Sequence, residues 1–228
     1  MTSEVDLAPI LKRIYESRFS PEDLAEMRGV WKVLVRDFFQ PRLRRDSSVL
    51  DVGAGPCLFI NEVSARRRVA VDANPNLAKF AGPGVEAIVT QDLSLSEVAD
   101  GSMGHAFLSN VLEHMPNFLA VLGLLDTIHR KLEPGGTLLV LQPNFRLLPG
   151  RYFDFIDHQV VLTDASLREA LESIGYEIDE MRVRFLPFTS KSALPKWPWL
   201  VWMYLRLRPA QWLLGKQTFV VARKKARK

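Results

Sequence analysis

The stretch Val49-Leu50-Asp51-Val52-Gly53-Ala54-Gly55-Pro56-Cys57 decides the fold class of this chain. Its first four residues are typical of a buried strand, and the two glycines after them indicate a tight turn that leads into a helix predicted over 57–65. Glycine lets the backbone approach a ligand closely, and a helix N-terminus favours a negatively charged group. The pattern indicates a ligand site at the carboxyl end of a strand, with an ordinary strand-to-helix turn as the alternative.

A carboxylate follows the glycine turn at a distance that suits a nucleoside. Val69-Ala70-Val71-Asp72 is predicted to be the second strand, and its final acid, about 20 residues after the turn, is placed to bind ribose hydroxyls. The turn lacks the Lys-Ser/Thr pair of a kinase or ATPase phosphate loop. Leu58 stands where a dinucleotide-binding fingerprint has its third glycine, so a Rossmann dehydrogenase is disfavoured. The pattern favours a nucleoside site of another kind.

Short apolar runs alternate with helical patterns from Ser48 onward. The predicted strands cover 48–52, 69–72, 85–90, 105–109, 137–142, 176–185 and 218–222. The predicted helices cover 57–65, 76–80, 118–132 and 164–174, and further helices precede the first strand within 7–40. The alternation predicts an α/β fold with a doubly wound, mostly parallel, seven-stranded sheet, N-terminal helices and an insertion before the last strand.

Four further motifs follow the glycine turn in order: Ala70-Val71-Asp72-Ala73-Asn74-Pro75, Gln91-Asp92-Leu93, Leu108–His114 and Lys131–Val140. With the glycine turn, this set resembles the class I S-adenosylmethionine-dependent methyltransferase family over 45–185, with a final strand at 217–223. The resemblance implies a Rossmann-like methyltransferase fold and S-adenosyl-L-methionine as cofactor. It also implies one domain over 1–228, divided into a helical cap (1–45), a cofactor-binding core (46–186), a basic aromatic insertion (187–215), and a last strand with a basic tail (216–228).

The resemblance assigns cofactor roles to residues at the strand ends. It implies that the methionine part of the cofactor is held by Gly53, Ala54 and Gly55, and that Asp51 accepts a hydrogen bond from the amino group of that part. It implies that Asp72 with Ala73 binds the ribose, and that Asp92 and Leu93 bind the adenine. Asn110 and Val111 are implied to meet the methionine end. For Asp92, a plain turn acid is the alternative. Cys57 departs from the family pattern, which often has a glycine there.

Methyl transfer is an in-line displacement with an activated, neutral leaving group, so positioning supplies much of the catalysis. A hydroxyl acceptor also benefits from a general base, and histidine suits that role near neutral pH. The catalytic candidates are His158, His114 and Tyr152, with local packing of His158 as the alternative. We expect structural roles for His105 and His129. The chain has no His and Cys pair at metal-ligand spacing, so no catalytic metal is expected.

Charge is unevenly distributed along the 228 residues, which carry 30 Lys and Arg against 26 Asp and Glu. Residues 1–180 hold 18 basic and 26 acidic residues, a net charge of −8, whereas 181–228 hold 12 basic and no acidic ones. A single cysteine excludes a disulfide framework and fits a reducing, cytoplasmic compartment. No secretory signal is recognised, and no apolar run reaches the roughly 20 residues that span a bilayer.

The segment 196–212 combines four tryptophans with aliphatic residues and cations, without one acid. Tryptophan settles at the lipid headgroup level and cations are attracted to anionic lipid, which predicts contact with the inner face of an anionic membrane. The alternative is that Trp199, Trp202 and Leu205 close the core or a homodimer face. The tail 223–228 is expected to be solvated, so nucleic acid is not favoured.

The acceptor predicted from these features is a small molecule, a glycan or a lipid-linked molecule, methylated at oxygen. Two alternatives stay open: a non-catalytic S-adenosylmethionine-binding partner subunit, and a methyltransferase that acts on RNA.

Overall fold

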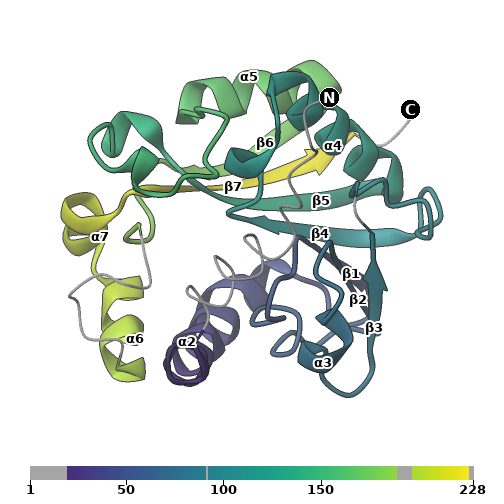
Figure 1. Cartoon of the computed structure of the whole chain (residues 1–228), viewed down its shortest axis with the longest axis horizontal. Helices are drawn as coiled ribbons and strands as arrows, with labels where there is room; N and C mark the ends of the chain where they lie inside the picture. Colours follow the sequence, from purple (N-terminus) through teal and green to yellow (C-terminus); the bar gives the residue numbers. More distant parts are fainter. Residues whose placement is uncertain (1–19, 91, 189–196, 226–228) are drawn as a thin grey trace, which may run out of the picture.

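The computed structural model describes residues 20–90, 92–188 and 197–225, and its strands form one seven-stranded sheet in the order β3-β2-β1-β4-β5-β7-β6 (Figure 1). The strands are β1 Ser48–Val52, β2 Arg67–Asp72, β3 Val85–Val89, β4 Met103–Ser109, β5 Leu132–Pro143, β6 Tyr176–Arg182 and β7 Gln217–Lys224. The first five pair in parallel, and β7 runs antiparallel to both of its neighbours. The predicted doubly wound, mostly parallel sheet is confirmed.

Helices cover both faces of the sheet. They are α2 Pro21–Leu34, α3 Leu77–Phe80, α4 Phe118–Lys131, α5 Asp164–Ile174, α6 Pro198–Arg206 and α7 Arg208–Leu214. Figure 1 shows α4 and α5 on one face and α2 on the other, with α6 beside α2. The predicted helical residues 7–19, and Gln91, Lys196 and 226–228 from the motifs above, lie outside the described residues.

The central strand β1 is buried along its whole length because helices cover it from both sides. Its side chains alternate between the two faces, as the period of a strand requires. Leu50 and Val52 pack in the core cluster that includes α4, and Val49 packs in the cluster that includes α2. The sheet is therefore a rigid middle layer that fixes where each strand ends.

The helix α2 begins after Ser20, whose side chain accepts a hydrogen bond from the Asp23 N–H at 3.1 Å. It ends at Leu34 and continues as a π-helical turn over Val35–Phe39. This turn directs Phe38 and Phe39 into the core, where both are buried.

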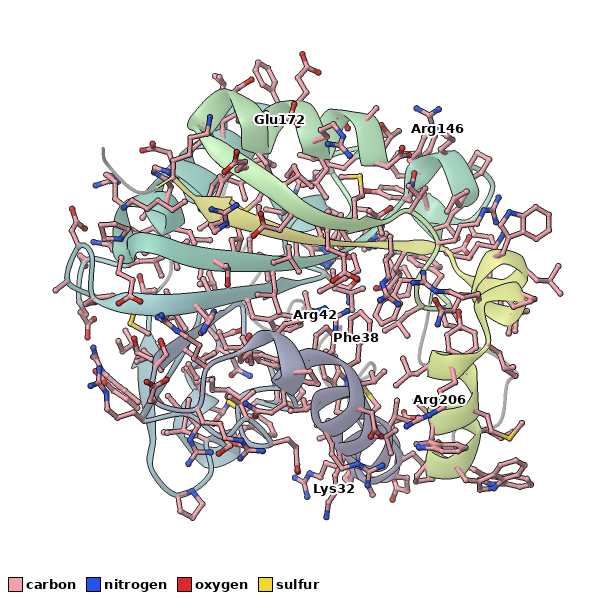
Figure 2. All side chains as sticks on the ribbon, turned by 180° about the vertical axis from the view of Figure 1, so that it is seen from behind. Lys32, Phe38, Arg42, Arg146, Glu172 and Arg206 are labelled. Atoms are coloured by element: carbon pink, nitrogen blue, oxygen red, sulfur yellow. The ribbon has the colours of Figure 1, made fainter. Side chains whose placement is uncertain are left out.

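Arg42 follows this turn and joins it to the far edge of the sheet. Its guanidinium lies 3.8 Å from the centroid of the Phe38 ring and donates to the carboxylate of Glu180 on β6 at 2.8 Å. Phe38 and Arg42 lie between α2 and the sheet (Figure 2). A cation that stacks on an aromatic ring while it pairs with a carboxylate keeps its charge satisfied on a partly buried surface.

The helix predicted over 57–65 does not form, and the chain passes this region as a series of turns. Cys57 has a φ of +56°, which interrupts right-handed helical geometry for a residue with a side chain. The family's glycine would adopt this conformation more easily. The turns still bury Phe59 and Ile60, so the apolar pattern that predicted a helix reflects burial.

The helix α5 confirms both of its predicted ends. Thr163 accepts a hydrogen bond from the Ser166 N–H, and the Ser166 side chain accepts one from the Thr163 N–H in return. Gly175 follows the last turn with a φ of +110°, in the left-handed conformation that commonly ends a helix. The loop that follows β5, residues 144–163 (the post-β5 loop), is thereby anchored at the N-terminus of α5.

His105 is a buried structural residue of β4, as the sequence analysis expected. The Arg44 N–H donates to its Nε2 at 3.0 Å, and its Nδ1 lies 2.7 Å from Thr137 Oγ1. Because Nε2 accepts a hydrogen bond, the ring is neutral and its Nδ1–H donates to the threonine. Burial, together with the nearby Arg44 cation, lowers the pKa of His105 to about 4.

This environment predicts a loss of stability at acidic pH. Below pH 6.5 His105 is protonated in the unfolded chain but stays neutral in the folded chain until the pH approaches 4. The free energy of unfolding therefore falls as the pH decreases from 6.5 toward 4. The loss at this site is at most about 3 kcal/mol. Urea unfolding from pH 7.5 to 4.5 measures it. His105→Gln, which keeps both hydrogen bonds but cannot titrate, should show a shallower decline; parallel curves would contradict the assignment.

Candidate functional site

The glycine turn leaves β1 at the point where the strand order reverses, between β1 and β4. The N–H groups of Gly53 and Ala54 donate to the Val71 carbonyl at 2.8 and 3.1 Å, which ties the turn to β2. A Cβ on Gly53 would lie 2.4 Å from Val111 Cγ2, whereas a Cβ on Gly55 would meet no atom within 4 Å. Gly53 therefore allows close packing, and Gly55 faces open space at the edge where such folds bind ligands.

Asp72 lies over this turn, where the sequence spacing placed it. Its carboxylate accepts hydrogen bonds from the Gly55 N–H at 2.7 Å and from the Asn74 N–H at 2.8 Å. A carboxylate has about four acceptor positions, so two of them are left for a ligand. Ala73, the next residue, is exposed at the same edge. The proposed contacts of both residues with ribose stay predictions.

Asp51 is buried directly behind the turn, within β1. Burial raises its pKa well above the usual range, the nearby Asp72 carboxylate raises it further, and the Ile60 backbone N–H lowers it in part. The charged form of a carboxyl group that is disfavoured by burial and by a neighbouring carboxylate is stabilised by a positively charged ligand group. This electrostatic setting suits the ammonium and sulfonium groups of S-adenosyl-L-methionine.

The Asp92 side chain is exposed in the loop after β3. It accepts hydrogen bonds from Thr90 Oγ1 at 2.7 Å and from the Ser94 N–H at 2.9 Å, and these bonds lower its pKa. Leu93 has a φ of +50° and packs against the core. These hydrogen bonds are what the alternative, a plain turn acid, would make. The carboxylate is nevertheless exposed, so it is accessible for the predicted contact with adenine.

Asn110 ends β4 in a left-handed conformation, with a φ of +53°. Asparagine is among the residues that adopt this conformation most readily. Its N–H donates to the Leu141 carbonyl at 2.9 Å, and its side chain is exposed at the sheet edge. Val111 then turns back against Gly53. The predicted residues of β1 and β4 thus meet at one edge.

The two histidines predicted on the acceptor side lie together, although they are 44 positions apart in the sequence. The carbonyl of Glu113 accepts from the N–H groups of Gln159 and Val160 at 2.8 and 3.1 Å, which fastens the post-β5 loop beside the end of β4. As a result, the rings of His114 and His158 meet edge to face with their centroids 5.0 Å apart.

Tyr152 has a different role from the predicted catalytic one. The side chain is fully buried, and its hydroxyl donates to the Val160 carbonyl at 2.6 Å. Burial raises the pKa of this hydroxyl well above its usual value. The ring packs against His158 with 4.9 Å between centroids. Tyr152 therefore holds the loop that carries His158 and does not face an acceptor.

Glu113 is the residue that the sequence analysis missed. Its side chain is only 1% exposed, and burial raises its pKa. Its Oε2 atom makes no hydrogen bond among the described residues, while the nearby Gln142 side chain lowers the pKa of the carboxyl in part. The sequence does contain one indication of its burial: Glu113 stands between an apolar residue, Leu112, and His114, in a turn that closely follows a buried strand.

The sequence matches a family model described as a methyltransferase domain over residues 24–181, more than two thirds of the chain. No protein of curated function is similar enough in sequence to match. Among solved structures, a SAM-dependent methyltransferase from Archaeoglobus fulgidus is 16% identical to this chain with a TM-score of 0.63. The match covers 94% of this chain and 99% of that one. One from Methanosarcina mazei is 18% identical with a TM-score of 0.61, and covers 84% and 98%.

A third similar structure holds ligands. It is the 1,6-didemethyltoxoflavin-N1-methyltransferase of Burkholderia thailandensis with bound 1,6-didemethyltoxoflavin and S-adenosylhomocysteine. It is 18% identical to this chain with a TM-score of 0.58, and the match covers 96% of this chain and 86% of that one. At these identities the three structures establish the fold, and the family match stands on the sequence.

Replacing Asp72 by Asn should weaken the binding of S-adenosylhomocysteine by about 10- to 100-fold, because hydrogen bonds to a charged acceptor contribute about 1.5–3 kcal/mol. Isothermal titration calorimetry measures the change in Kd. Glu86→Gln, an exposed acid on β3 that pairs with Arg67, is the matched control and should bind as the unmodified chain does. An unchanged Kd in Asp72→Asn would remove Asp72 from the cofactor site.

Proposed function

The chain belongs to the methyltransferase-domain family, whose members use S-adenosyl-L-methionine, and we propose that it methylates an oxygen atom of a small-molecule, glycan or lipid-linked acceptor. The observation that carries the proposal is the shared edge of β1 and β4. There Val111 packs against Gly53 of the turn that Asp72 holds, and His114, three residues after Val111 in the chain, meets His158. A donor site and a polar acceptor site are thus adjacent.

The reaction proceeds by one displacement. A lone pair of the acceptor oxygen attacks the methyl carbon, the bond from that carbon to sulfur breaks, and its electron pair stays on sulfur to leave neutral S-adenosylhomocysteine. The proton of the acceptor hydroxyl passes to an imidazole of the His114–His158 pair and from there to solvent. Asp51 and Asp72 hold the positively charged donor by their charge, and this fixed orientation supplies much of the rate. The two imidazoles meet the acceptor hydroxyl from the β4 side.

Formation of S-adenosylhomocysteine in the presence of hydroxyl-bearing acceptors tests this function. We expect turnover to fall by about 10²- to 10⁴-fold in His158→Gln, with the Kd for S-adenosylhomocysteine changed less than twofold. His129→Gln, a partly buried histidine of α4 that packs on Tyr176, is the control. Cofactor binding without turnover on any acceptor would favour a non-catalytic partner subunit. Turnover on RNA alone would favour a methyltransferase that acts on RNA.

The face formed by α6 and α7 supports the lipid-linked acceptor among these classes. Large apolar side chains project from it into solvent: Trp197, Trp199, Trp202, Met203, Leu207, Trp212 and Leu213, which are 40–69% exposed. The Arg206 guanidinium lies 4.0 Å from the Trp202 ring centroid, and Figure 2 shows Arg206 on α6 at the edge of the molecule. None of the described helices is long and apolar enough to cross a membrane.

The opposite side of α6 packs on the domain. Val201 and Leu205 join the core cluster that includes α2, and the Tyr204 hydroxyl donates to the Phe185 carbonyl. Leu205 therefore packs on the core, as the alternative expected, whereas Trp199 and Trp202 are 55% and 41% exposed and remain accessible to a membrane or to a homodimer partner. We propose that the exposed face rests on an anionic membrane, with tryptophans at the headgroup level and Arg206 and Arg208 on anionic lipid.

Co-sedimentation with vesicles tests this contact. We expect binding to vesicles that contain phosphatidylserine and a loss of most of it in Arg206→Glu/Arg208→Glu, since each cation contributes about 1 kcal/mol near an anionic surface. Arg146→Glu/Arg168→Glu changes the net charge equally on the side of α5, where Figure 2 labels Arg146, and should bind normally. Equal losses in both variants, or a stable dimer that buries this face, would contradict the membrane proposal.

A further inference from the structure

We propose that Glu113, His114 and His158 form a binding site for a divalent transition-metal ion, Zn²⁺ in the first place, on the acceptor side of β4. Each of the three offers one ligand atom, and these atoms all lie within 4.8 Å of one another. Glu113 and His158 are buried and His114 is partly exposed, so the cluster opens to solvent on one side. Spacing along the sequence predicted no metal, because it cannot show that the distant His158 lies beside Glu113 and His114.

A second observation points to a cation. Glu113 is 99% buried, and its Oε2 atom has no hydrogen-bond partner among the described residues. A buried carboxylate oxygen without a partner is costly, and such groups in proteins are paired or bound to metals. A bound cation would compensate this oxygen.

The orientation of His114 is that of a metal ligand. Its Nδ1 lies 3.1 Å from the Asp157 carbonyl oxygen and 3.2 Å from the Asp157 carboxylate. A proton on Nδ1 satisfies both acceptors and leaves the lone pair on Nε2, which lies 4.0 Å from Glu113 Oε1. Histidines that bind metals through one ring nitrogen commonly donate from the other to a carboxylate or a backbone carbonyl.

The donor set selects the class of metal. Two imidazoles with one carboxylate suit Zn²⁺ and its first-row neighbours, and leave an open position for water or substrate. Mg²⁺ prefers oxygen ligands and is a poor match. Zinc bonds of about 2.0–2.1 Å hold ligands about 3.3 Å apart, so ligand atoms that lie up to 4.8 Å apart must approach one another by up to about 1.5 Å when the ion binds.

The consequence for catalysis rests on the proposed function. An ion at this position would bind the acceptor oxygen at its open site and lower the pKa of the hydroxyl, as a bound metal does for water. The acceptor proton then leaves to solvent, and the oxygen attacks the methyl carbon as described above. In this arrangement, His114 and His158 act on the hydroxyl through the ion they bind.

Titration of the chelator-treated full chain with Zn²⁺ tests the site. We expect one Zn²⁺ per chain, a loss of affinity of at least 10-fold in His114→Ala and in His158→Gln, and a loss of about 10-fold in Asp157→Asn. The control His129→Ala should bind as the unmodified chain does, and Mg²⁺ should not compete. Absorption of bound Co²⁺ in the visible range, present in the chain and absent in His114→Ala, reports imidazole ligation without relying on activity.

Stoichiometric binding that is insensitive to the His114 and His158 substitutions, or no stoichiometric binding, would overturn the metal site. The Kd for S-adenosylhomocysteine is measured on the same samples. A chain that binds cofactor and methylates an acceptor but binds no Zn²⁺ refutes the metal site alone, and equal turnover with and without bound Zn²⁺ refutes the ion's role in the reaction. A chain that binds Zn²⁺ at these residues but methylates no acceptor refutes the proposed function alone.

Discussion

The close contact between Gly53 and Val111 is the constraint on which the site depends. It joins the end of β1 to the end of β4, where the strand order reverses and the sheet edge opens to a ligand. A Cβ on Gly53 would overlap the valine, so only a glycine lets both turns keep their positions. Asp72 lies above the first turn and the Glu113–His114 pair follows the second, so this contact sets the distance between the two halves of the site.

The acceptor side is built by hydrogen bonds between segments that are far apart in the sequence. The Glu113 carbonyl fixes the backbone of 159–160, and Tyr152 fixes the same loop from within through Val160. These bonds bring a histidine of the loop onto a histidine of the β4 turn. The Glu113 carboxylate is buried in this cluster, away from water, and its Oε2 atom makes no hydrogen bond among the described residues.

The segregation of charge has a structural counterpart. The acidic first part of the chain includes Asp51 and Asp72, the two carboxyl groups that we propose to hold the positively charged cofactor. The basic last part forms α6, α7 and β7, and one of its cations, Arg206, lies over the exposed Trp202 on α6.

Local patterns determined the fold class, because the β1 strand with its glycine turn, the acid that ends β2, and the caps of α5 each depend on residues close together in the chain. Tertiary structure decided what depends on distant contacts or on the side that a residue faces. It set Cys57 in a left-handed turn where periodicity predicted a helix, buried Tyr152, and turned Leu205 inward but Trp199 outward. It also assembled Glu113, His114 and His158, because only the parallel sheet places the ends of β4 and β5 at one edge.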